Sequence, residues 1–262
     1  MNVIFKNLVS LASEGAFSTP NTVVPMSEFK WNILYQLAVL EDIAPYVRNG
    51  ILSHEDDKNA NIPYDVKNMF EKAVFMDQDK LDKYFDMTDL DRQMLTYVVK
   101  KYLLKDIVYK ERHSIDTSKI SLDFLSLILQ NTNLILRNGI RMRGIIETGL
   151  FLRTKGQLVD FVKVEMWLRR LKLRKMASLQ ASVLVDMFGF ERDEFPYIRK
   201  FRKNGQNLTV KSLKRVEKAN RLERTFSKYS IVNFIRYFEY SHSEAFCKMV
   251  STLTRCLSEI EE

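Results

Sequence analysis

The side chains best suited to bind a ligand lie between residues 197 and 224. Upstream, basic residues alternate with Tyr197 and Phe201, a mixture that can hold phosphates and stack on bases. Downstream, helical spacing places the basic residues on one stripe roughly 100° wide, with Leu213 and Val216 on the opposite face. The predicted polyanion-binding residues are Arg199, Lys200, Arg202, Lys203, Lys211, Lys214, Arg215, Lys218 and Arg221.

Two other interpretations of this basic tract stay open. Residues 198–225 hold ten basic side chains against Glu217 and Glu223, so the tract could be a solvated, solubilising surface. It could also pair with the acidic region from Asp77 to Asp91. No helix-turn-helix glycine turn, zinc knuckle or aromatic RNA-binding motif accompanies it.

Carboxylates that could hold a metal ion lie upstream, at Asp86, Asp89 and Asp91. Asp89 and Asp91 open a helical pattern, in which residues two apart diverge by about 200° and do not converge on one ion. Acidic residues at a helix N-terminus are the simpler interpretation. The run from Glu111 to His113 likewise indicates a solvated helix end. The sequence therefore predicts no catalytic residue, no metal and no cofactor.

Arg143 and Glu147 are four residues apart among apolar neighbours, which predicts a buried ion pair on one helix face. A contact to a ligand is the alternative for this pair. Trp31 and Trp167 lie on apolar faces and are predicted core residues.

Composition favours long helices with few connections. Only 8 Gly and 5 Pro occur in 262 residues, while 46% of the residues are hydrophobic. The net charge of +8 is uneven: residues 1–131 sum to −4 and residues 132–262 to +12. Two cysteines and three widely spaced histidines give no metal-ligand spacing, and a reducing cytoplasmic location is expected. No signal peptide or membrane span is predicted.

Helical patterns follow one another along the chain. Ser27 is a candidate N-cap for a helix in which Phe29, Ile33, Leu37 and Leu40 repeat at helical spacing. Gly50 is predicted to end the next helix, residues 121–138 are the candidate central helix, and Asp160 is a candidate N-cap. A long helix is predicted from about residue 230 onward.

The fold prediction is all-α, an irregular multi-helix bundle of roughly ten helices with no substantial sheet. Residues 1–262 are predicted to form a single helical domain, with a soft division near 112–120 and a basic helical extension over 198–262.

Three segments, NGIRMRGIIETGLFL, VDFVKVEMWLRRLKLRKMASLQASVLVDMFGF and DEFPY, resemble the C-terminal helical region of an uncharacterised bacterial nucleotidyltransferase-like family. The positions that carry this resemblance are Gly139, Ile140, Met142, Arg143 and Glu147. The lead-in residues Trp31, Tyr35, Ala38, Pro45 and Gly50 are also similar.

That family has a mixed α/β catalytic palm between these flanks, with a Gly-Ser turn and an Asp-x-Asp pair that hold Mg²⁺ and a triphosphate. This chain has no Gly-Ser sequence, and its pair Asp89 and Asp91 opens a helical pattern. The resemblance therefore implies a relative without the palm.

The leading hypothesis is a non-enzymatic, soluble helical protein that acts by macromolecular interaction, with a protein partner and no membrane. The alternatives are a nucleic-acid (polyanion) binding protein that uses residues 199–224, and an active nucleotidyltransferase whose motifs are not evident in the sequence.

Overall fold

The computed structural model describes residues 2–55, 57, 60–75, 98–219 and 226–258. Within these ranges every regular element is helical and none is a strand, which confirms the all-α prediction. The described helices number twelve rather than about ten. They are α1 (Val3–Phe17), α2 (Glu28–Leu40), α3 (Ala44–Ser53), α4 (Tyr64–Phe75), α6 (Val98–Arg112), α7 (Lys119–Asn138), α8 (Met142–Lys155), α9 (Phe161–Arg170), α10 (Arg174–Phe188), α11 (Gly205–Ala219), α12 (Phe226–Tyr237) and α13 (His242–Ser258). Short 3-10 turns are η3 (Gly156–Leu158), η4 (Arg192–Glu194) and η5 (Phe238–Tyr240).

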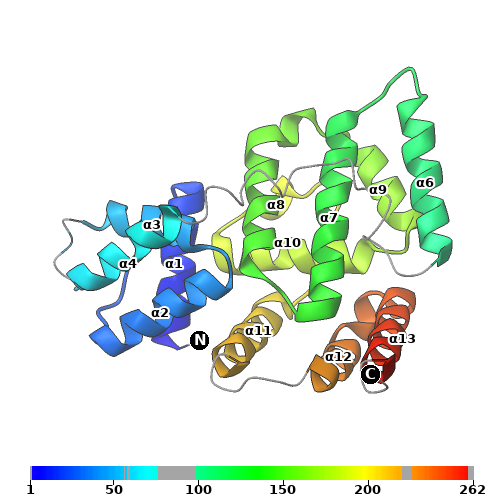
Figure 1. Cartoon of the computed structure of the whole chain (residues 1–262). Coiled ribbons are helices and arrows are strands. Elements are labelled where there is room, and N and C mark those ends of the chain that lie inside the picture. Colours follow the sequence, from blue (N-terminus) through cyan, green and yellow to red (C-terminus); the bar gives the residue numbers. More distant parts are fainter. Residues whose placement is uncertain (1, 56, 58–59, 76–97, 220–225, 259–262) are drawn as a thin grey trace.

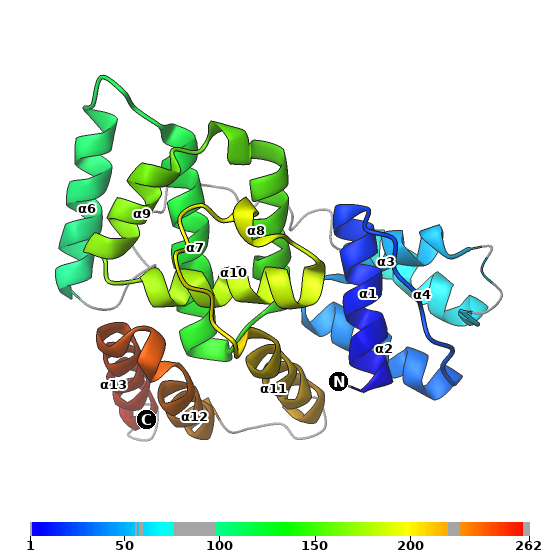
Figure 2. The same cartoon turned by 180° about the vertical axis from the view of Figure 1, so that it is seen from behind.

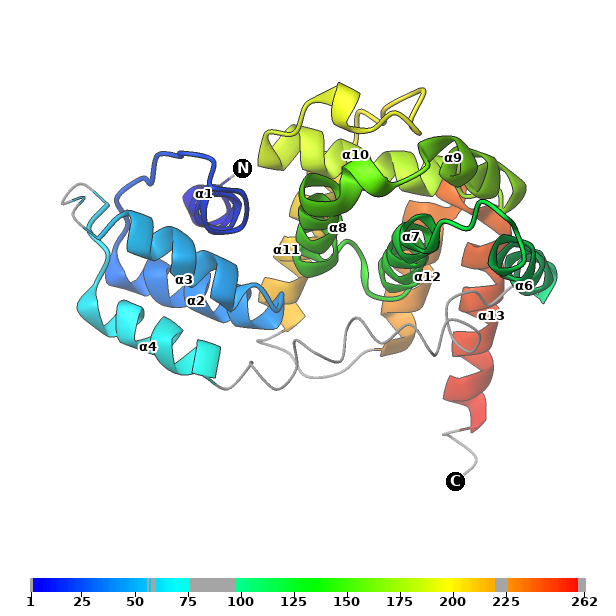
Figure 3. The same ribbon diagram turned by 90° about the horizontal axis from the view of Figure 1, so that it is seen from above.

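Helix α7 is the central helix, as its nearly continuous apolar sequence predicts. It packs against α8, α9, α10, α12 and α13, which surround it in Figures 1 and 3. Its buried Asn131 donates a hydrogen bond to the carbonyl of Gly144 on α8 at 2.8 Å. A Cβ at Gly144 would lie 2.0 Å from the Asn131 side-chain oxygen, so glycine is what allows this close approach.

Helices α1 to α4 form a group at the N-terminal side of the molecule (Figure 1). Helix α1 packs closely on α3 because glycines face the neighbouring backbone. A Cβ would lie 1.8 Å from the Tyr46 carbonyl at Gly15, and 2.1 Å from the Leu11 carbonyl at Gly50. The prediction that Gly50 ends its helix is therefore wrong, since α3 continues to Ser53 and Gly50 is a packing position within it.

Helix α2 buries only part of the predicted apolar set: Leu37 is buried and Ile33 is half-buried, while the two end positions are exposed. Phe29 is 70% exposed and Leu40 is 39% exposed, whereas Trp31 and Leu34 are fully buried. The predicted core position of Trp31 is confirmed. The apolar residues of α2 lie on more than one face, and the face that contacts α1, α3, α4 and α11 decides which of them are buried.

Glu41, just after α2, ties the N-terminal helices to α8. Its carboxylate is 1% exposed, accepts the Met142 N–H at 2.9 Å and pairs with Arg141 at 3.1 Å. Burial raises the pKa of Glu41, against the opposing effects of Arg141 and the Met142 N–H. The chain thus supplies a carboxylate from one segment to the N-terminus of another helix, where a negative charge is favoured.

The predicted ion pair within α8 is confirmed. Arg143 and Glu147 are each 7% exposed, and the Arg143 Nε donates to the Glu147 carboxylate. A guanidinium nitrogen of Arg143 also donates to the Asp42 carbonyl at 2.8 Å, and the Tyr46 ring lies 5.7 Å from the guanidinium. The pair is therefore a further connection between α8 and the N-terminal helices.

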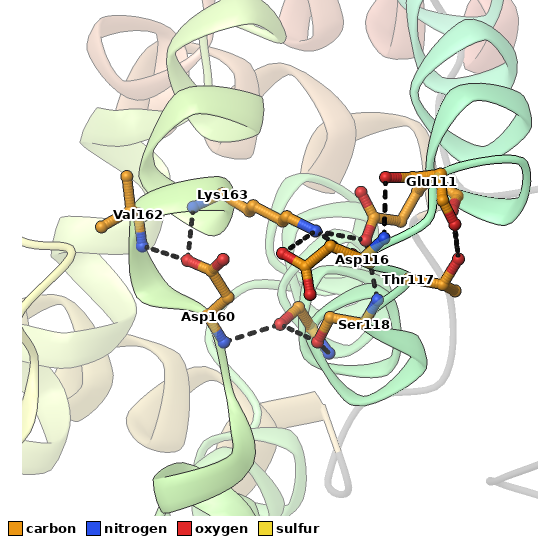
Figure 4. Close-up of polar contacts among 9 residues, drawn as sticks. Glu111, Asp116, Thr117, Ser118, Asp160, Val162 and Lys163 are labelled. Carbon is orange, nitrogen blue, oxygen red and sulfur yellow. Dashed lines mark hydrogen bonds and ion pairs between the residues drawn. The ribbon is translucent and has the colours of Figure 1, made fainter.

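A polar cluster joins the end of α6 to the start of α9 (Figure 4). Glu111 accepts the Ser118 N–H at 2.8 Å and pairs with Lys163 at 2.9 Å. Asp160 accepts the N–H groups of Val162 and Lys163, each at 3.0 Å, which confirms it as the N-cap of α9. The carboxylate of Glu111 is 6% exposed and joins α6 to the start of α7, so the expectation of a solvated helix end is wrong for this residue.

The C-terminal region is not one long helix from about residue 230, and that prediction is wrong. Helix α12 ends at Tyr237, the chain makes the 3-10 turn η5, and α13 begins at His242. Tyr237 and Tyr240 are buried at this turn, so packing of their rings accompanies the break. Over the described ranges, no helix has the length and apolar character needed to cross a bilayer.

Candidate anion-binding pocket

A cavity of about 610 Å³ lies among α6, the start of α10, the segment before α11, and the junction between η5 and α13. This volume is within the usual range of ligand pockets, roughly 300–1,000 Å³. The lining residues are Lys100, Lys172, Arg174, Lys175, Ser178, Tyr197, Ile198, Arg199, Lys200, Arg202, Tyr240, Ser241, His242 and Ser243.

The lining is strongly cationic. Seven of its residues are Lys or Arg and none is Asp or Glu. Cations held around one cavity repel one another. An anion placed among them is attracted to each cation, and this attraction offsets the repulsion. The electrostatics of the pocket therefore favour an anionic ligand.

Lys100 is the most enclosed of these cations. It extends from α6, is 3% exposed, and its ammonium donates to the Ser241 hydroxyl at 3.0 Å. Burial lowers the pKa of Lys100, and the charge of Lys172 lowers it further, while Glu244 opposes both effects. A buried ammonium that also feels a second cation is stabilised by any anion that reaches it.

The start of α10 adds to the positive potential. Leu173 at the N-cap makes no side-chain capping bond, and the first turn carries Arg174 and Lys175 with no acidic residue. Lys172, just before it, has a left-handed backbone with φ of 54°. The N-terminus of a helix is already its positive end, so these two cations are placed where an anion, not a cation, is stabilised.

The start of α13 faces the same cavity through Ser241, His242 and Ser243. The first backbone bond of this helix runs from the Ala245 N–H to the Ser241 carbonyl at 2.9 Å. The N–H groups of the first turn therefore lack acceptors within the helix. Two helix N-termini and a set of cationic side chains border one cavity.

The segment before α11 is held along α10, which it follows in Figure 2. Ser178 on α10 donates its hydroxyl to the Lys200 carbonyl. One turn further along α10, the Ser182 hydroxyl accepts the Arg202 N–H at 2.7 Å. These two bonds fix the backbone that carries the basic side chains at the cavity.

Tyr197 does not offer a free face to a base, in contrast to the stacking role predicted for it. It is 2% exposed, and its ring packs 5.3 Å from Phe124 and 5.6 Å from Phe161. Complete burial raises the pKa of the Tyr197 hydroxyl. The predicted partner Phe201 is half-buried and packs 5.9 Å from Phe195. Neither ring therefore offers the pocket a free aromatic face.

Glu165 on α9 lies beside the pocket and engages its rim. Its carboxylate pairs with Arg199 at 2.8 Å and with Arg174 and Arg169 at 3.3 Å each. Burial opposes its ionisation, but the hydrogen bonds and charges of these arginines outweigh burial and lower the pKa of Glu165. Glu165 thus competes with any anion for two of the lining arginines.

The structure divides the predicted basic tract. Its upstream residues Arg199, Lys200 and Arg202 line the cavity, whereas Lys203 is exposed outside the lining. The downstream residues belong to α11: Lys211 and Lys214 are exposed, and Arg215 donates to Asn233 at 2.8 Å. Lys218 is in α11, and Arg221 lies outside the described residues. Among the described side chains of the tract, those of α11 do not line the cavity that the upstream residues line.

Four lining cations were not among the predicted residues: Lys100, Lys172, Arg174 and Lys175. Three of them lie in the sequence RRLKLRK over residues 169–175, where five of seven residues are basic. The density of basic residues in this segment is a sequence pattern that indicates an anion-binding surface. Lys100 has no such signal, because only the packing of α6 near α13 brings it to the pocket.

The remaining sequence candidates give no second site. Asp86, Asp89 and Asp91, together with the acidic region 77–91, lie outside the described residues. Across the part of the chain that the structure describes, no group of three or more His, Cys, Asp or Glu side chains could hold a metal ion. His113 is exposed and bonds the Tyr109 carbonyl at 2.7 Å, as expected for a helix end.

Comparison with known proteins identifies no relative: no family model, curated protein or solved structure matches the chain.

Proposed function

We propose that this protein binds nucleic acid through the basic pocket and performs no chemistry on it. The single observation that supports this proposal is a cavity with seven Lys or Arg side chains and no carboxylate in its lining. A phosphate backbone brings one negative charge per nucleotide, so several lining cations can be neutralised by one short strand.

Binding of this kind depends on salt in a measurable way. Glu165 already forms ion pairs with Arg174 and Arg199, so five lining cations are not paired with this carboxylate. If about four of them contact phosphates, log K falls with log salt concentration with a slope near about −3 for a single strand.

The test is fluorescence anisotropy of a labelled single-stranded oligonucleotide across a salt series. The pocket variant is Lys175→Glu with Lys200→Glu, two exposed lining lysines. The matched control is Lys211→Glu with Lys214→Glu, two exposed lysines of α11 with the same change in net charge. The pocket variant should lose binding by about 100-fold or more, since each lost charge-assisted contact contributes roughly tenfold. The control should stay within a few-fold of the wild type.

Equal losses in the two variants would show that general charge attraction explains binding, and the pocket proposal would fail. Loss in the α11 variant alone would place the site on the downstream part of the basic tract. Absence of binding by the wild type at low salt would remove the proposed function itself.

A protein partner is the second candidate function, and exposed apolar side chains support it. Tyr102 and Tyr109 are one heptad apart on α6 and are 71% and 64% exposed. Val162 and Met166 are four apart on α9 and are 80% and 56% exposed. Such side chains, when contiguous, are typical of protein interfaces. Sedimentation velocity tests this candidate. The wild type and the double variant Tyr102→Ser with Val162→Ser are compared, each alone and in native extract. If these side chains bind a partner, the wild type should sediment faster in extract than alone, and the variant should lose that increase.

The relation to a palm-less nucleotidyltransferase stays a proposal that rests on the residues quoted above. The rival hypothesis, an active enzyme, predicts that Mg²⁺ with a nucleoside triphosphate raises the melting temperature, since a ligand of the native state stabilises it. Lack of any shift at millimolar nucleotide would exclude that rival.

A further inference from the structure

We infer that the enclosed end of the basic pocket, at Lys100 and the first turn of α13, seats a phosphate monoester, so that a phosphorylated strand end binds better than internal phosphodiesters. This inference rests on the proposed function and specifies which group enters the site. The shared chemistry is a terminal phosphate, whether it comes from a strand end or from a free phosphorylated compound.

The first argument is the position of Lys100. The other lining cations include exposed side chains such as Lys175 and Lys200, whereas Lys100 is 3% exposed. Its one hydrogen bond among the described residues goes to the Ser241 hydroxyl at 3.0 Å. An ammonium group has three donors, so the residues that the structure describes leave two of them for a ligand.

The second argument is the helix terminus beside Lys100. Ser241 directly precedes the 17-residue helix α13, and Ser241, His242 and Ser243 all line the cavity. Backbone N–H groups of a first turn bind phosphate oxygens readily. Glu244, in the same turn, is 2% exposed and stabilises the charged form of Lys100, but it does not line the cavity.

The third argument is charge. Lys172 faces the same cavity and lowers the pKa of Lys100, so two cations act on one space, and the buried Glu244 offsets part of their charge. A phosphate monoester carries about −1.5 to −2 charge at neutral pH and has three terminal oxygens. A phosphodiester has a single charge and two free oxygens. The doubly charged group therefore matches the two cations and the N–H donors better.

Geometry adds a fourth argument. An internal phosphodiester needs a path for the strand on both of its sides, whereas a terminal phosphate needs only one. Lys100 on α6 is 3% exposed and donates to Ser241 at the start of α13, so it is the most covered cation of the lining. A strand end can reach it with the rest of the strand leaving past Arg199 and Lys200, which are exposed at the rim.

The test compares one labelled oligonucleotide in three forms: 5′-phosphorylated, 3′-phosphorylated and unphosphorylated. We expect one phosphorylated form to bind at least about tenfold tighter, the size expected from one or more charge-assisted hydrogen bonds. Lys100→Met should reduce that preference to near unity while weaker, salt-dependent binding remains.

The matched control is Lys248→Met. Lys248 is another half-buried lysine, which donates to Asn133 at 2.7 Å and does not line the cavity. If Lys100→Met does not fold, Ser241→Ala is the second variant. It removes the hydroxyl beside the Lys100 ammonium and keeps the buried charge. Circular dichroism melting establishes that each variant is folded.

The outcomes separate the two proposals. Equal binding of all three forms overturns the terminal-phosphate inference and leaves nucleic-acid binding in place. If no oligonucleotide binds but inorganic phosphate or pyrophosphate raises the melting temperature in a Lys100-dependent way, the phosphate seat stands and nucleic-acid binding fails. No response to any of these probes overturns both.

Discussion

Neutralising Glu165 should strengthen anion binding rather than weaken the protein. This carboxylate pairs with Arg199 at 2.8 Å and with Arg174 at 3.3 Å, and both arginines line the basic pocket. It therefore holds two lining cations away from a ligand and adds a negative charge beside the site. The Glu165→Gln variant keeps the shape of the side chain and removes only the charge.

The size of the effect follows from distance. A phosphate on the far side of the Arg199 guanidinium would lie about 7 Å from Glu165, where unit charges repel by about 0.6 kcal/mol in water and about 2.4 kcal/mol at an effective dielectric constant near 20. The Glu165 side chain is 18% exposed, so solvent screens it in part. We expect a gain of about 1 kcal/mol, or about fivefold in affinity.

The assay is the oligonucleotide anisotropy titration at low and moderate salt. The control is Asp106→Asn, which neutralises a carboxylate paired with Arg170 and Lys110, neither of which lines the pocket. An equal rise in affinity in the two variants would refute the proposed competition by Glu165 for Arg174 and Arg199, because the change in net charge alone would then explain the rise. Weaker binding by Glu165→Gln would show that the ion pairs position the arginines for the ligand.

Three further predictions concern stability. Glu147→Met leaves Arg143 buried without its carboxylate and should lower the free energy of unfolding by about 3–5 kcal/mol in urea titration, whereas a loss under 1 kcal/mol would contradict the buried pair. Gly50→Ala places a Cβ 2.1 Å from the Leu11 carbonyl and should cost about 1–3 kcal/mol by forcing α1 from α3, while an unchanged melting temperature would contradict that packing. The raised pKa of Glu41 means that its contribution is present below the usual value of 4.5 and is lost as pH rises through the folded-state pKa. The unfolding free energy of the wild type relative to Glu41→Gln should therefore fall from pH 4.5 upward, and a difference that does not change with pH would contradict the burial of this charge.

Local sequence rules were sufficient where the cause is local. The Asp160 cap, the apolar α7 and the Arg143–Glu147 pair depend on neighbours within one or two turns, and each is present in the structure. Gly50 and the exposed Phe29 were misjudged because their environments are set by α1 and by the partners of α2, which no local pattern contains.

The candidate site shows the same division. Arg199, Lys200 and Arg202 were predicted because they are dense in one segment, and they do meet at one cavity. The helical stripe with Lys211 was grouped with them by sequence proximity, yet the chain turns at α11 and separates the two sets. Lys100 comes from a helix about 100 residues upstream, so only the tertiary fold could assign it to the pocket.

The cations of the pocket also bear on the rival interpretation as a solubilising surface. Solubilising charges are exposed and gain nothing from proximity to one another, whereas Lys100 is buried at some cost in stability, to which the charge of Lys172 adds and which Glu244 offsets only in part. Replacing Lys172, the cation whose charge acts on Lys100, as in Lys172→Glu, should relieve that repulsion and raise the melting temperature while it weakens binding. A solvated, solubilising surface gives no reason for the melting temperature to rise while the binding affinity falls. A rise in melting temperature together with a loss of affinity would therefore distinguish a binding pocket from a solvated face.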